Sequence, residues 1–456
     1  MALKASDIQK KLPEGGKKNC KECGFPTCFA FAMKLASGAV SVQKCPCLPA
    51  EVKTELEEGL APPIRLVTIG TGETAFSMGE EEVIYRHEKT FYRPSGIAIL
   101  ISDKEDEGTI SAKINKLKAL QFDRVGQKLR ANLFALKYAG NSEKYLGLVK
   151  RVGTEGFPIV LICEDLDLLF KARDLIADKN PLLYPITKEN LDAALPKLKA
   201  KPAPIGVKGG SIEEIIPMTQ RLKEEGIQDI AIDPSPKSLK EMVRDYMLIR
   251  RAALKKTFRP LGYPILSLPY QLAENKMEET LLASAGVIKY AGVIVLSDFE
   301  KEMLYPLLVL RQNIFTDPRV PLAVEHNIYE IGSVSPESPV LLTTNFALTY
   351  FAVASEIENS KIPAYLCVKD TEGLCVLAAW STGKFSGDTA GPFLKKIGIA
   401  DKVKNKRVII PGFAARIKGE LEEELQGWEV IVGPREASDL PAFLPQIIEK
   451  WKSQSK

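Results

Sequence analysis

The feature that most constrains the fold is a regular alternation of short apolar runs and stretches with helical periodicity between about residues 96 and 315. Eight strand-then-helix units in about 220 residues predict an α/β fold with parallel strands joined by right-handed crossovers. Eight strands are also the number that closes a TIM (β/α)8 barrel, and a doubly wound open sheet is the alternative. The predicted strands are Gly96–Ile101, Leu133–Tyr138, Pro158–Cys163, Leu182–Ile186, Pro204–Val207, Asp229–Ile232, Tyr263–Leu268 and Val293–Leu296.

A shorter alternation follows from about residue 327 and predicts a small open, Rossmann-like α/β sheet, with strands near residues 340–343, 364–368, 407–410 and 428–432. Ligands of such sheets lie beyond the carboxyl ends of the strands, against helix N-termini. Loops rich in Gly, Thr and small residues are expected there, which lets backbone N–H groups approach a phosphate or a large flat ligand. These loops are Thr343–Asn345, Asp370–Gly373, Pro411–Gly412 and Gly433–Ser438.

Near the N-terminus, four cysteines are spaced C-x2-C-x4-C-x16-C, at Cys20, Cys23, Cys28 and Cys45. The first three lie on a loop with Gly and Pro, and ligation by four thiolates suits an iron–sulfur cluster. Structural zinc is the alternative, although zinc sites usually pair two C-x2-C knuckles and only one is present here. Cys47 is an exposed-looking spare thiol beside this set.

Other residue types offer little for catalysis. The remaining cysteines, Cys163, Cys367 and Cys375, lie in apolar contexts and are expected in the core. With only His87 and His326 in the chain, histidine-based catalysis and His-rich metal sites are nearly excluded. Acidic residues at predicted strand ends of the barrel are candidates for an active site, with helix capping as the simpler interpretation. They are Asp103, Glu164, Asp165, Asp167, Asp233 and Asp298.

The bulk composition predicts a cytoplasmic protein with no nucleic-acid partner and no membrane span. The net charge is +4 over 456 residues, no apolar run has membrane-spanning length without a charge, and the first residues lack a signal-peptide core. Six lysines crowd the first 21 residues, which indicates a solvated basic face or a docking surface for an acidic electron donor.

Three domains are therefore expected: a cluster domain with its linker over residues 1–60, a barrel domain over 61–325 and an α/β domain over 326–456. A β-hairpin or small β-extension is predicted between Ile64 and Phe91. Pro46–Pro63, which reads as a short helix flanked by linker, and roughly Asp317–Pro339 are expected to be flexible.

The order of these modules, together with particular stretches, resembles the large subunit of the corrinoid iron–sulfur protein, the γ subunit of the acetyl-CoA decarbonylase/synthase system. The resemblance covers essentially the whole chain. The stretches that carry it are KKNCKECGFPTCFAFAMKLASG, FDRVGQ, PLLYPIT, RPLGYPIL, RQNIFTDPRVP, VLLTTNFALTYF and WEVIVGPREAS.

The resemblance implies a 4Fe–4S cluster held by Cys20, Cys23, Cys28 and Cys45, and a cobamide held by the C-terminal domain. Family members carry Thr, close to the lower face of cobalt, where this chain has Ala378, so a role for a hydroxyl there is in doubt. The cofactor-binding residues that it implies are Thr344, Tyr350, Gly373, Leu374, Cys375, Val376, Leu377, Ala378, Gly433 and Ala437.

The chain lacks the D-x-H-x-x-G signature through which many corrinoid carriers supply an axial histidine, so a bound corrinoid is expected to be base-off without a protein nitrogen on cobalt. Without that donor, Co(II) is easier to reduce to Co(I).

By resemblance, the function is that of a methyl-carrier subunit of the anaerobic acetyl-CoA pathway rather than a self-sufficient enzyme. Cobalt(I) would accept a methyl group from methyl-tetrahydrofolate or a related pterin through a methyltransferase and pass it to acetyl-CoA synthase/CO dehydrogenase, and the cluster would reactivate Co(II). The implied partners also include a small corrinoid iron–sulfur subunit, as a heterodimer, and a low-potential donor such as ferredoxin. The alternatives are a corrin-free electron-transfer subunit and a barrel methyltransferase with its own pterin site.

Overall fold

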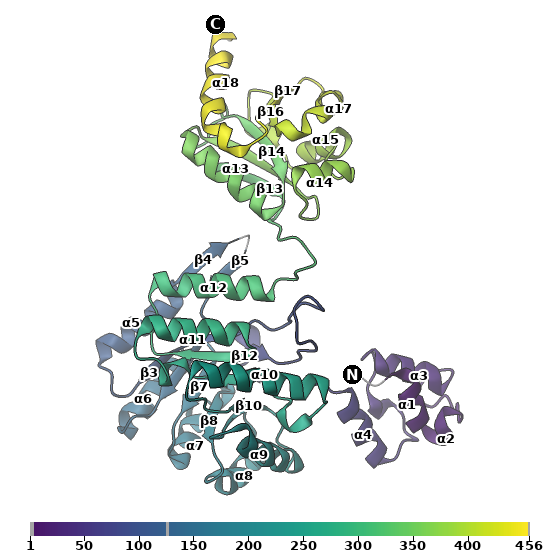
Figure 1. The fold of residues 1–456 in the computed structure, drawn as a ribbon, viewed down its shortest axis with the longest axis vertical. Coiled ribbons are helices and arrows are strands. Elements are labelled where there is room, and N and C mark those ends of the chain that lie inside the picture. The colour runs from purple at the N-terminus through teal and green to yellow at the C-terminus, as the bar shows by residue number, and fades with distance from the viewer. Residues whose placement is uncertain (1–3, 125–126, 455–456) are drawn as a thin grey trace. The chain divides into compact units, whose positions relative to one another are not determined.

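A computed structural model describes residues 4–124 and 127–454, and they divide into two compact units with the main boundary between Thr316 and Asp317 (Figure 1). The first residues form a small helical domain in which Phe31 and Leu35 pack with Ile8 and Leu56. The helix that begins at Cys28 is capped by Thr27, whose hydroxyl accepts a hydrogen bond from the Ala30 N–H at 3.0 Å. The helices are α1 (Ala5–Lys11), α2 (Pro13–Gly16), α3 (Cys28–Ala36) and α4 (Ala50–Leu60).

All eight predicted strands form one closed parallel barrel with the order β10-β11-β12-β3-β6-β7-β8-β9, which confirms the TIM-like fold and excludes the open sheet. The strands are β3 (Gly96–Ser102), β6 (Leu133–Lys137), β7 (Ile159–Ile162), β8 (Leu182–Ile186), β9 (Ile205–Lys208), β10 (Ile230–Asp233), β11 (Ile265–Ser267) and β12 (Ala291–Leu296). The helices that connect or follow them are α5 (Glu107–Ala119), α6 (Ser142–Gly153), α7 (Leu166–Leu175), α8 (Leu191–Ala200), α9 (Ile212–Glu224), α10 (Leu239–Lys255), α11 (Lys276–Ile288) and α12 (Lys301–Phe315).

The barrel is stabilised by two apolar layers, because side chains of a strand alternate between its two faces. On β3, Ile97, Ile99 and Ile101 pack in the layer between strands and helices, whereas Ala98 and Leu100 belong to the barrel interior. The strands are buried on both sides, so their sequences read as continuous apolar runs, and this is why the sequence located them well.

An antiparallel hairpin of β1 (Val67–Ile69) and β2 (Phe76–Met78) forms the β-extension expected before the barrel. Its side chains join the apolar layer of the barrel interior. The close approach requires glycine: a Cβ at Gly96 would lie 2.8 Å from the Phe76 ring, and one at Gly292 would lie 2.9 Å from the Met78 sulfur. A second hairpin, β4 (Gln121–Arg124) with β5 (Gln127–Arg130), was not predicted. Val125 and Gly126 of the FDRVGQ stretch lie outside the described residues.

The C-terminal domain is the predicted open α/β sheet, now with five strands in the order β13-β15-β14-β16-β17. The antiparallel edge strand β13 and the helix α15 are additions to the prediction. The strands are β13 (Asn327–Ile331), β14 (Val340–Thr344), β15 (Ala364–Lys369), β16 (Arg407–Ile410) and β17 (Glu429–Val432). The helices are α13 (Ala347–Ser360), α14 (Val376–Ser381), α15 (Gly387–Lys396), α16 (Ile399–Lys402), α17 (Lys418–Glu424) and α18 (Leu440–Gln454).

Each face of this sheet is covered by its own apolar layer. Helices α13 and α18 contribute to one layer, with Ile357 and Leu444 fully buried. Helices α14, α15 and α17 contribute to the other, with Ala379, Leu394 and Leu421. None of the helices in the described part of the chain combines the length and apolarity needed to cross a membrane.

Candidate functional site

The four N-terminal cysteines line one cavity of the helical domain, as their spacing predicted, and Cys47 lines it as well. Cys23 and Cys45 are buried, and Cys20, Cys28 and Cys47 are half-buried. The loop that carries Cys20 and Cys23 is closed by Asn19, whose side-chain oxygen accepts the backbone N–H of Cys28 at 2.8 Å. Five thiols around one cavity are a donor set that fits an iron–sulfur cluster, since sulfur is the ligand such clusters require.

The electrostatics of this cavity combine burial with nearby charge. Burial is the main cause that raises the pKa of the Cys45 thiol above its ordinary value. A hydrogen bond to the Glu22 carboxylate is the main cause that raises the pKa of Cys47. Lys18 donates a hydrogen bond to the Cys47 sulfur, and this bond raises the pKa of the Lys18 ammonium.

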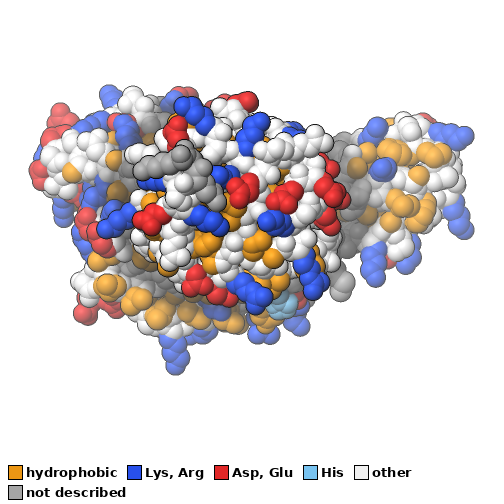
Figure 2. Space-filling model, turned by 90° about the horizontal axis from the view of Figure 1, so that it is seen from above, with side chains coloured by type: hydrophobic (Ala, Val, Ile, Leu, Met, Phe, Trp, Pro, Cys, Tyr) orange, Lys and Arg blue, Asp and Glu red, His pale blue; other side chains and the backbone are white. Residues whose placement is uncertain are grey.

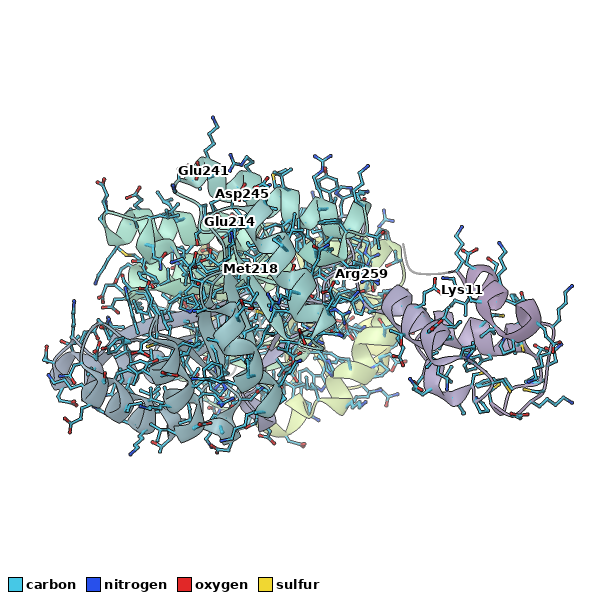
Figure 3. All side chains as sticks on the ribbon, turned by 90° about the horizontal axis from the view of Figure 1, so that it is seen from below. Lys11, Glu214, Met218, Glu241, Asp245 and Arg259 are labelled. Atoms are coloured by element: carbon cyan, nitrogen blue, oxygen red, sulfur yellow. The ribbon has the colours of Figure 1, made fainter. Side chains whose placement is uncertain are left out.

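Exposed lysines give the N-terminal domain a basic surface. Lys4, Lys10, Lys17, Lys18 and Lys21 are all exposed, and basic side chains are conspicuous on the domain in Figure 2, at the right of that view. Elsewhere on the face in Figure 2, basic and acidic side chains are interspersed. The sixth lysine of the group, Lys11 on α1, is instead used within the domain, with its Nζ 2.5 Å from Glu55 on α4 (Figure 3 labels Lys11).

The C-terminal domain contains a cavity of about 320 Å³ at the carboxyl ends of β14, β16 and β17. This position is the topological switch point of the sheet, because β15 lies on one side of β14 and β16 on the other. The lining is mostly apolar, and Arg435 and Glu436 are its charged members. The volume lies at the lower end of the range for cofactor sites.

Five of the ten implied cofactor residues line this cavity: Cys375, Val376, Leu377, Gly433 and Ala437. Cys375 is exposed, so the expectation that it is a core residue is wrong. It precedes α14 at the helix N-cap position, where the chain leaves the sheet, whereas Cys163 and Cys367 are buried as expected.

The other five implied residues lie outside the lining: Thr344, Tyr350, Gly373, Leu374 and Ala378. Tyr350 on α13 packs against Tyr329, with ring centroids 4.7 Å apart. Gly373 has a positive φ of 72°, and a Cβ there would lie 2.9 Å from the Pro321 carbonyl oxygen. Gly373 therefore shapes a turn, and the cavity-lining residues Cys375–Leu377 follow that turn directly.

One residue that the sequence did not single out fixes this turn. The side-chain oxygen of Asn345, directly after β14, accepts the backbone N–H groups of Thr371 at 2.9 Å and Gly373 at 3.0 Å. Its side-chain nitrogen donates to Asp370 at 2.9 Å. Asn345 thereby links the Thr343–Asn345 and Asp370–Gly373 loops, a pairing visible only once β14 and β15 are known to be neighbours.

Two buried hydroxyl groups at the end of β14 provide a test of ligand fit. The side chains of Thr343 and Thr344 are almost completely buried, and neither hydroxyl has a hydrogen-bond partner within the described structure. Thr343 also contributes to the lining of the cavity. Buried polar atoms are normally satisfied, so an orphaned hydroxyl next to a cavity is consistent with a partner supplied by a ligand.

The acidic candidates of the barrel do not converge on a catalytic centre. Asp165 caps α7 by accepting the Leu168 N–H at 3.0 Å, as the simpler interpretation predicted. Asp298 accepts hydrogen bonds from Lys116 at 2.8 and 3.0 Å, and Asp167 pairs with Lys197.

Asp103 accepts the backbone N–H of Asn141 at 2.6 Å, and Glu164 is exposed. Asp233 is buried, accepts the Tyr184 hydroxyl at 2.6 Å and the Ser235 N–H at 2.7 Å, and has its pKa raised by burial. These contacts tie strand ends and loops together.

At this end of the barrel, glutamates of two helices also bind the loops that precede them. Glu214 accepts the Gly210 N–H at 2.7 Å before α9, and Glu241 accepts the Lys237 N–H at 2.8 Å before α10 (both are labelled in Figure 3). Both bonds go to the residue before the helix N-cap, so these glutamates join the preceding loop to the first turn of their helix.

Comparison of this chain with known proteins identifies one family. A family model described as "CO dehydrogenase/acetyl-CoA synthase delta subunit" matches residues 66–444, and one described as "Putative Fe-S cluster" matches residues 16–47. The corrinoid/iron-sulfur protein large subunit of Moorella thermoacetica is 43% identical, covering 97% of this chain and 98% of that protein.

Two archaeal relatives cover almost the same length. The acetyl-CoA decarbonylase/synthase complex subunit gamma of Methanothermobacter thermautotrophicus is 32% identical over 98% of this chain, and that of Methanopyrus kandleri is 35% identical over 97%. These relatives cover both ends of the molecule as well as the barrel, and they confirm the resemblance drawn from the sequence. The chain therefore belongs to the family of corrinoid/iron–sulfur protein large subunits, which are the gamma subunits of archaeal acetyl-CoA decarbonylase/synthase complexes.

Proposed function

We propose that this chain is the methyl-carrier subunit of an acetyl-CoA pathway, with a corrinoid in the C-terminal domain and a 4Fe–4S cluster in the N-terminal domain. The observation that carries the proposal is the apolar cavity at the switch point of the C-terminal sheet, next to the orphaned Thr343 hydroxyl. When bound, the corrinoid would supply a nucleophilic Co(I) for the methyl group, and the cluster would supply the electron that restores this state.

The thiols of Cys20, Cys23, Cys28 and Cys45 would hold the cluster. Their placement around one cavity supports the assignment, and the match of residues 16–47 to an iron–sulfur family supports it independently of the barrel. Exposed lysines on the same domain would attract an acidic electron donor such as a ferredoxin, and this attraction would weaken with salt.

The residues that line the cavity would contact the corrinoid directly, whereas the remaining implied residues would position them. Cys375, Val376, Leu377, Gly433 and Ala437 belong to the first group. Thr344 and Leu374 flank the loops that Asn345 ties together, Gly373 forms the turn, Ala378 continues α14, and Tyr350 supports α13 through Tyr329.

The binding mode would be base-off without a protein nitrogen on cobalt. His87 and His326 are the only histidines of the chain. Both fall within the described residues, and neither lines the cavity of the C-terminal domain. Axial ligand identity is a main lever on a cofactor's potential, so leaving this position without a histidine favours the reduced metal.

A second subunit would complete the corrinoid site. The macrocycle with its side chains is larger than the cavity, so part of it would project from the domain. Leu348, Leu377 and Phe413 line the cavity and are 70%, 48% and 38% exposed, which leaves an apolar rim that a covering partner would bury. The small corrinoid iron–sulfur subunit would supply that cover, and the methyltransferase and acetyl-CoA synthase/CO dehydrogenase would take turns at the exposed face.

The exchange of partners would require the chain to move as separate domains, about 1–60, 61–325 and 326–456. The stretches Pro46–Pro63 and Asp317–Pro339 were expected to be flexible, but α4 packs Leu56 into the N-terminal core and β13 pairs with β15 in the C-terminal sheet. Only the parts of these stretches outside α4 and β13 would act as connections.

The test is elemental analysis and visible spectroscopy of the full chain, produced without oxygen together with its small subunit and with cobamide supplied. The proposal predicts about one cobalt and about four iron atoms per chain. A brown cluster spectrum without cobalt would instead favour the corrin-free electron-transfer subunit. Methylation from methyl-tetrahydrofolate with no added methyltransferase would favour the barrel methyltransferase.

The division of labour between the two groups is testable with Cys23→Ala. This change should abolish reductive reactivation of oxidised cobalt, while cobalt reduced beforehand by an artificial donor still accepts the methyl group. Unchanged reactivation in this variant would refute the cluster assignment.

A further inference from the structure

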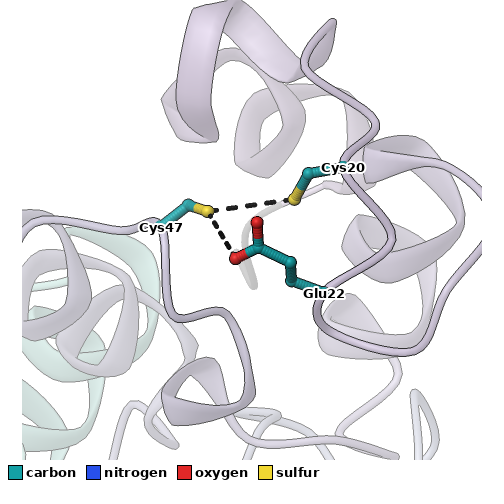
Figure 4. Close-up of side chains that lie close together, drawn as sticks. All are labelled: Cys20, Glu22 and Cys47. Carbon is teal, nitrogen blue, oxygen red and sulfur yellow. Dashed lines mark hydrogen bonds between the residues drawn. The ribbon is translucent and has the colours of Figure 1, made fainter.

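The cluster cavity contains one thiol more than a cubane cluster requires. Cys47 follows Cys45 after a single proline, and its sulfur lies 3.8 Å from the Cys20 sulfur (Figure 4). The Cys47 thiol also donates to Glu22 at 3.2 Å and accepts from Lys18 Nζ at 3.4 Å. All of its side-chain contacts therefore lie at the Cys20 corner of the cavity, whereas its backbone N–H faces the Cys45 thiol.

The distance between these two sulfurs can be compared with the spacing of thiolates in two bound arrangements. Two thiolates on one tetrahedral metal ion with metal–sulfur bonds of about 2.3 Å are ~3.8 Å apart, the edge of the tetrahedron. Two thiolates on different irons of a cubane lie farther apart, because the separation of the irons adds to that spacing. At 3.8 Å the two thiols lie within hydrogen-bonding contact of each other, so both are at one corner of the cavity rather than at two separate corners.

Glu22 strengthens this geometry. Its carboxylate oxygen and the sulfurs of Cys20 and Cys47 all lie within 4.8 Å of one another, as Figure 4 shows. A carboxylate at this position can hold the thiol proton while the sulfur is exchanged. The Lys18 ammonium, 3.4 Å from the Cys47 sulfur, would stabilise negative charge on whichever sulfur is not bound to iron.

We propose that Cys20 and Cys47 serve the same corner of the cluster, so that Cys47 is an alternative ligand that can replace Cys20. This proposal rests on the cluster assigned above. In the exchange, the iron–sulfur bond to Cys20 breaks and one to Cys47 forms. The proton of the Cys47 thiol passes to the released Cys20 sulfur, with Glu22 between them, and no electron is transferred.

The experiment compares four variants of the full chain after anaerobic reconstitution: Cys47→Ala, Cys20→Ala, the double variant Cys20→Ala/Cys47→Ala, and Cys23→Ala as the matched control. The readouts are iron and sulfide per chain and the electron paramagnetic resonance spectrum of the reduced cluster. Cys23 is the control because it is a predicted ligand that is not among the side-chain partners of Cys47, which are Lys18, Cys20 and Glu22.

Cys47→Ala is expected to keep the full iron content. Cys20→Ala should keep more than half of it, with a shifted resonance spectrum, because Cys47 takes the vacant position. The double variant and Cys23→Ala should each lose at least about five-fold in iron, since no thiol replaces the missing one.

Equal iron losses in Cys20→Ala and the double variant would overturn the proposal, and so would a Cys20→Ala chain that neither folds nor holds iron. A loss in Cys47→Ala as large as that in the control would also overturn it, because Cys47 would then be a resident ligand rather than an alternative. A wild-type chain that takes up zinc or no metal would refute the cluster itself, which separates the failure of the proposed function from the failure of this inference.

Discussion

The N-terminal domain surrounds five thiols with a small core, whereas the C-terminal domain places its cavity at one end of a five-stranded sheet that is covered by an apolar layer on each face. In the first, the loop that carries Cys20 and Cys23 has no regular structure between Lys17 and Thr27, and Cys28 follows it as the first residue of α3. In the second, the residues around the cavity follow strands that pair with their neighbours through backbone hydrogen bonds.

This difference indicates that the cluster and the corrinoid would contribute differently to the folding of their domains. A domain of about 60 residues buries little apolar surface, and metals commonly supply the missing stability. A sheet domain of about 130 residues buries enough to fold by itself, so its ligand selects a prepared site. The N-terminal domain would therefore need its cluster to fold, whereas the C-terminal domain would fold first and bind the corrinoid afterwards.

The largest expected effect follows from removing each group in turn. Stripping iron with a chelator should increase amide exchange in α3 on the order of 100-fold, because cluster ligation and folding of this domain are coupled. Removing the corrinoid should leave the amides of β14 and β15 protected. Hydrogen–deuterium exchange read by mass spectrometry on the same sample measures both, and an iron-free chain with α3 still protected would break the comparison.

A matched pair of core substitutions gives the next largest effect. Phe31 and Phe385 are 1% and 0% exposed, in the N-terminal and C-terminal domains, and truncation of either to Ala should cost about 3–5 kcal/mol. In the small domain this loss should prevent iron incorporation, whereas in the larger domain the fold should persist with a lower unfolding midpoint. Iron content and thermal unfolding of the two variants decide the matter, and equal tolerance at both positions would contradict the contrast.

The same contrast explains what the sequence could predict. Barrel strands are buried on both faces, so they appear as apolar runs, and all eight were located. Edge elements carry a weaker signal: β13 has one buried residue, Ile331, and β4 has no buried residue at all. The β4–β5 hairpin and β13 were missed for this reason, since period and burial were the only guides to a strand.

Among the site residues, those fixed by local spacing were placed better than those fixed by tertiary contacts. The cysteines within one loop come together as predicted, and the strand-end loops reach the cavity except for Asp370–Gly373. Asn345 was named only as part of the Thr343–Asn345 loop, and its role as a link was missed because its partners lie 25 to 28 residues away, on a neighbouring strand's loop. Cys375 was assigned to the core because its neighbours are apolar, yet it faces solvent at the start of α14.

A smaller effect is expected from narrowing the prepared cavity. A Cβ at Gly433 would lie 2.9 Å from Ile409 Cγ2 and 3.1 Å from the Ile410 carbonyl oxygen, so Gly433→Val should push into the lining. Cobamide retention should fall about 10-fold, equal to ~1.4 kcal/mol. Gly419→Val is the control, because a Cβ at Gly419 on α17 meets nothing within 4 Å. Equal cobalt content in both variants would remove Gly433 from the site.

The smallest effect separates two cysteines of the C-terminal domain. Cys375 is exposed and lines the cavity, whereas burial raises the pKa of Cys367 to about 12 from 9.0. The thiolate is the reactive form, so iodoacetamide near neutral pH should modify Cys375 and leave Cys367 intact in the folded chain. Because burial favours the neutral Cys367 thiol, its contribution to the free energy of unfolding is fully present below pH 9.0. This contribution is lost as the pH rises toward about 12.

The modified Cys375 should lower cobamide uptake only about 3-fold, because the Cys375 side chain is exposed and the cavity behind it keeps its shape. Bound cobamide should in turn slow the alkylation of Cys375, since ligand and reagent would compete for the same lining. Peptide mapping of the labelled protein with and without cobamide measures both. An alkylation rate that cobamide does not change would place the corrinoid away from Cys375, and the prepared cavity would then have to serve another ligand.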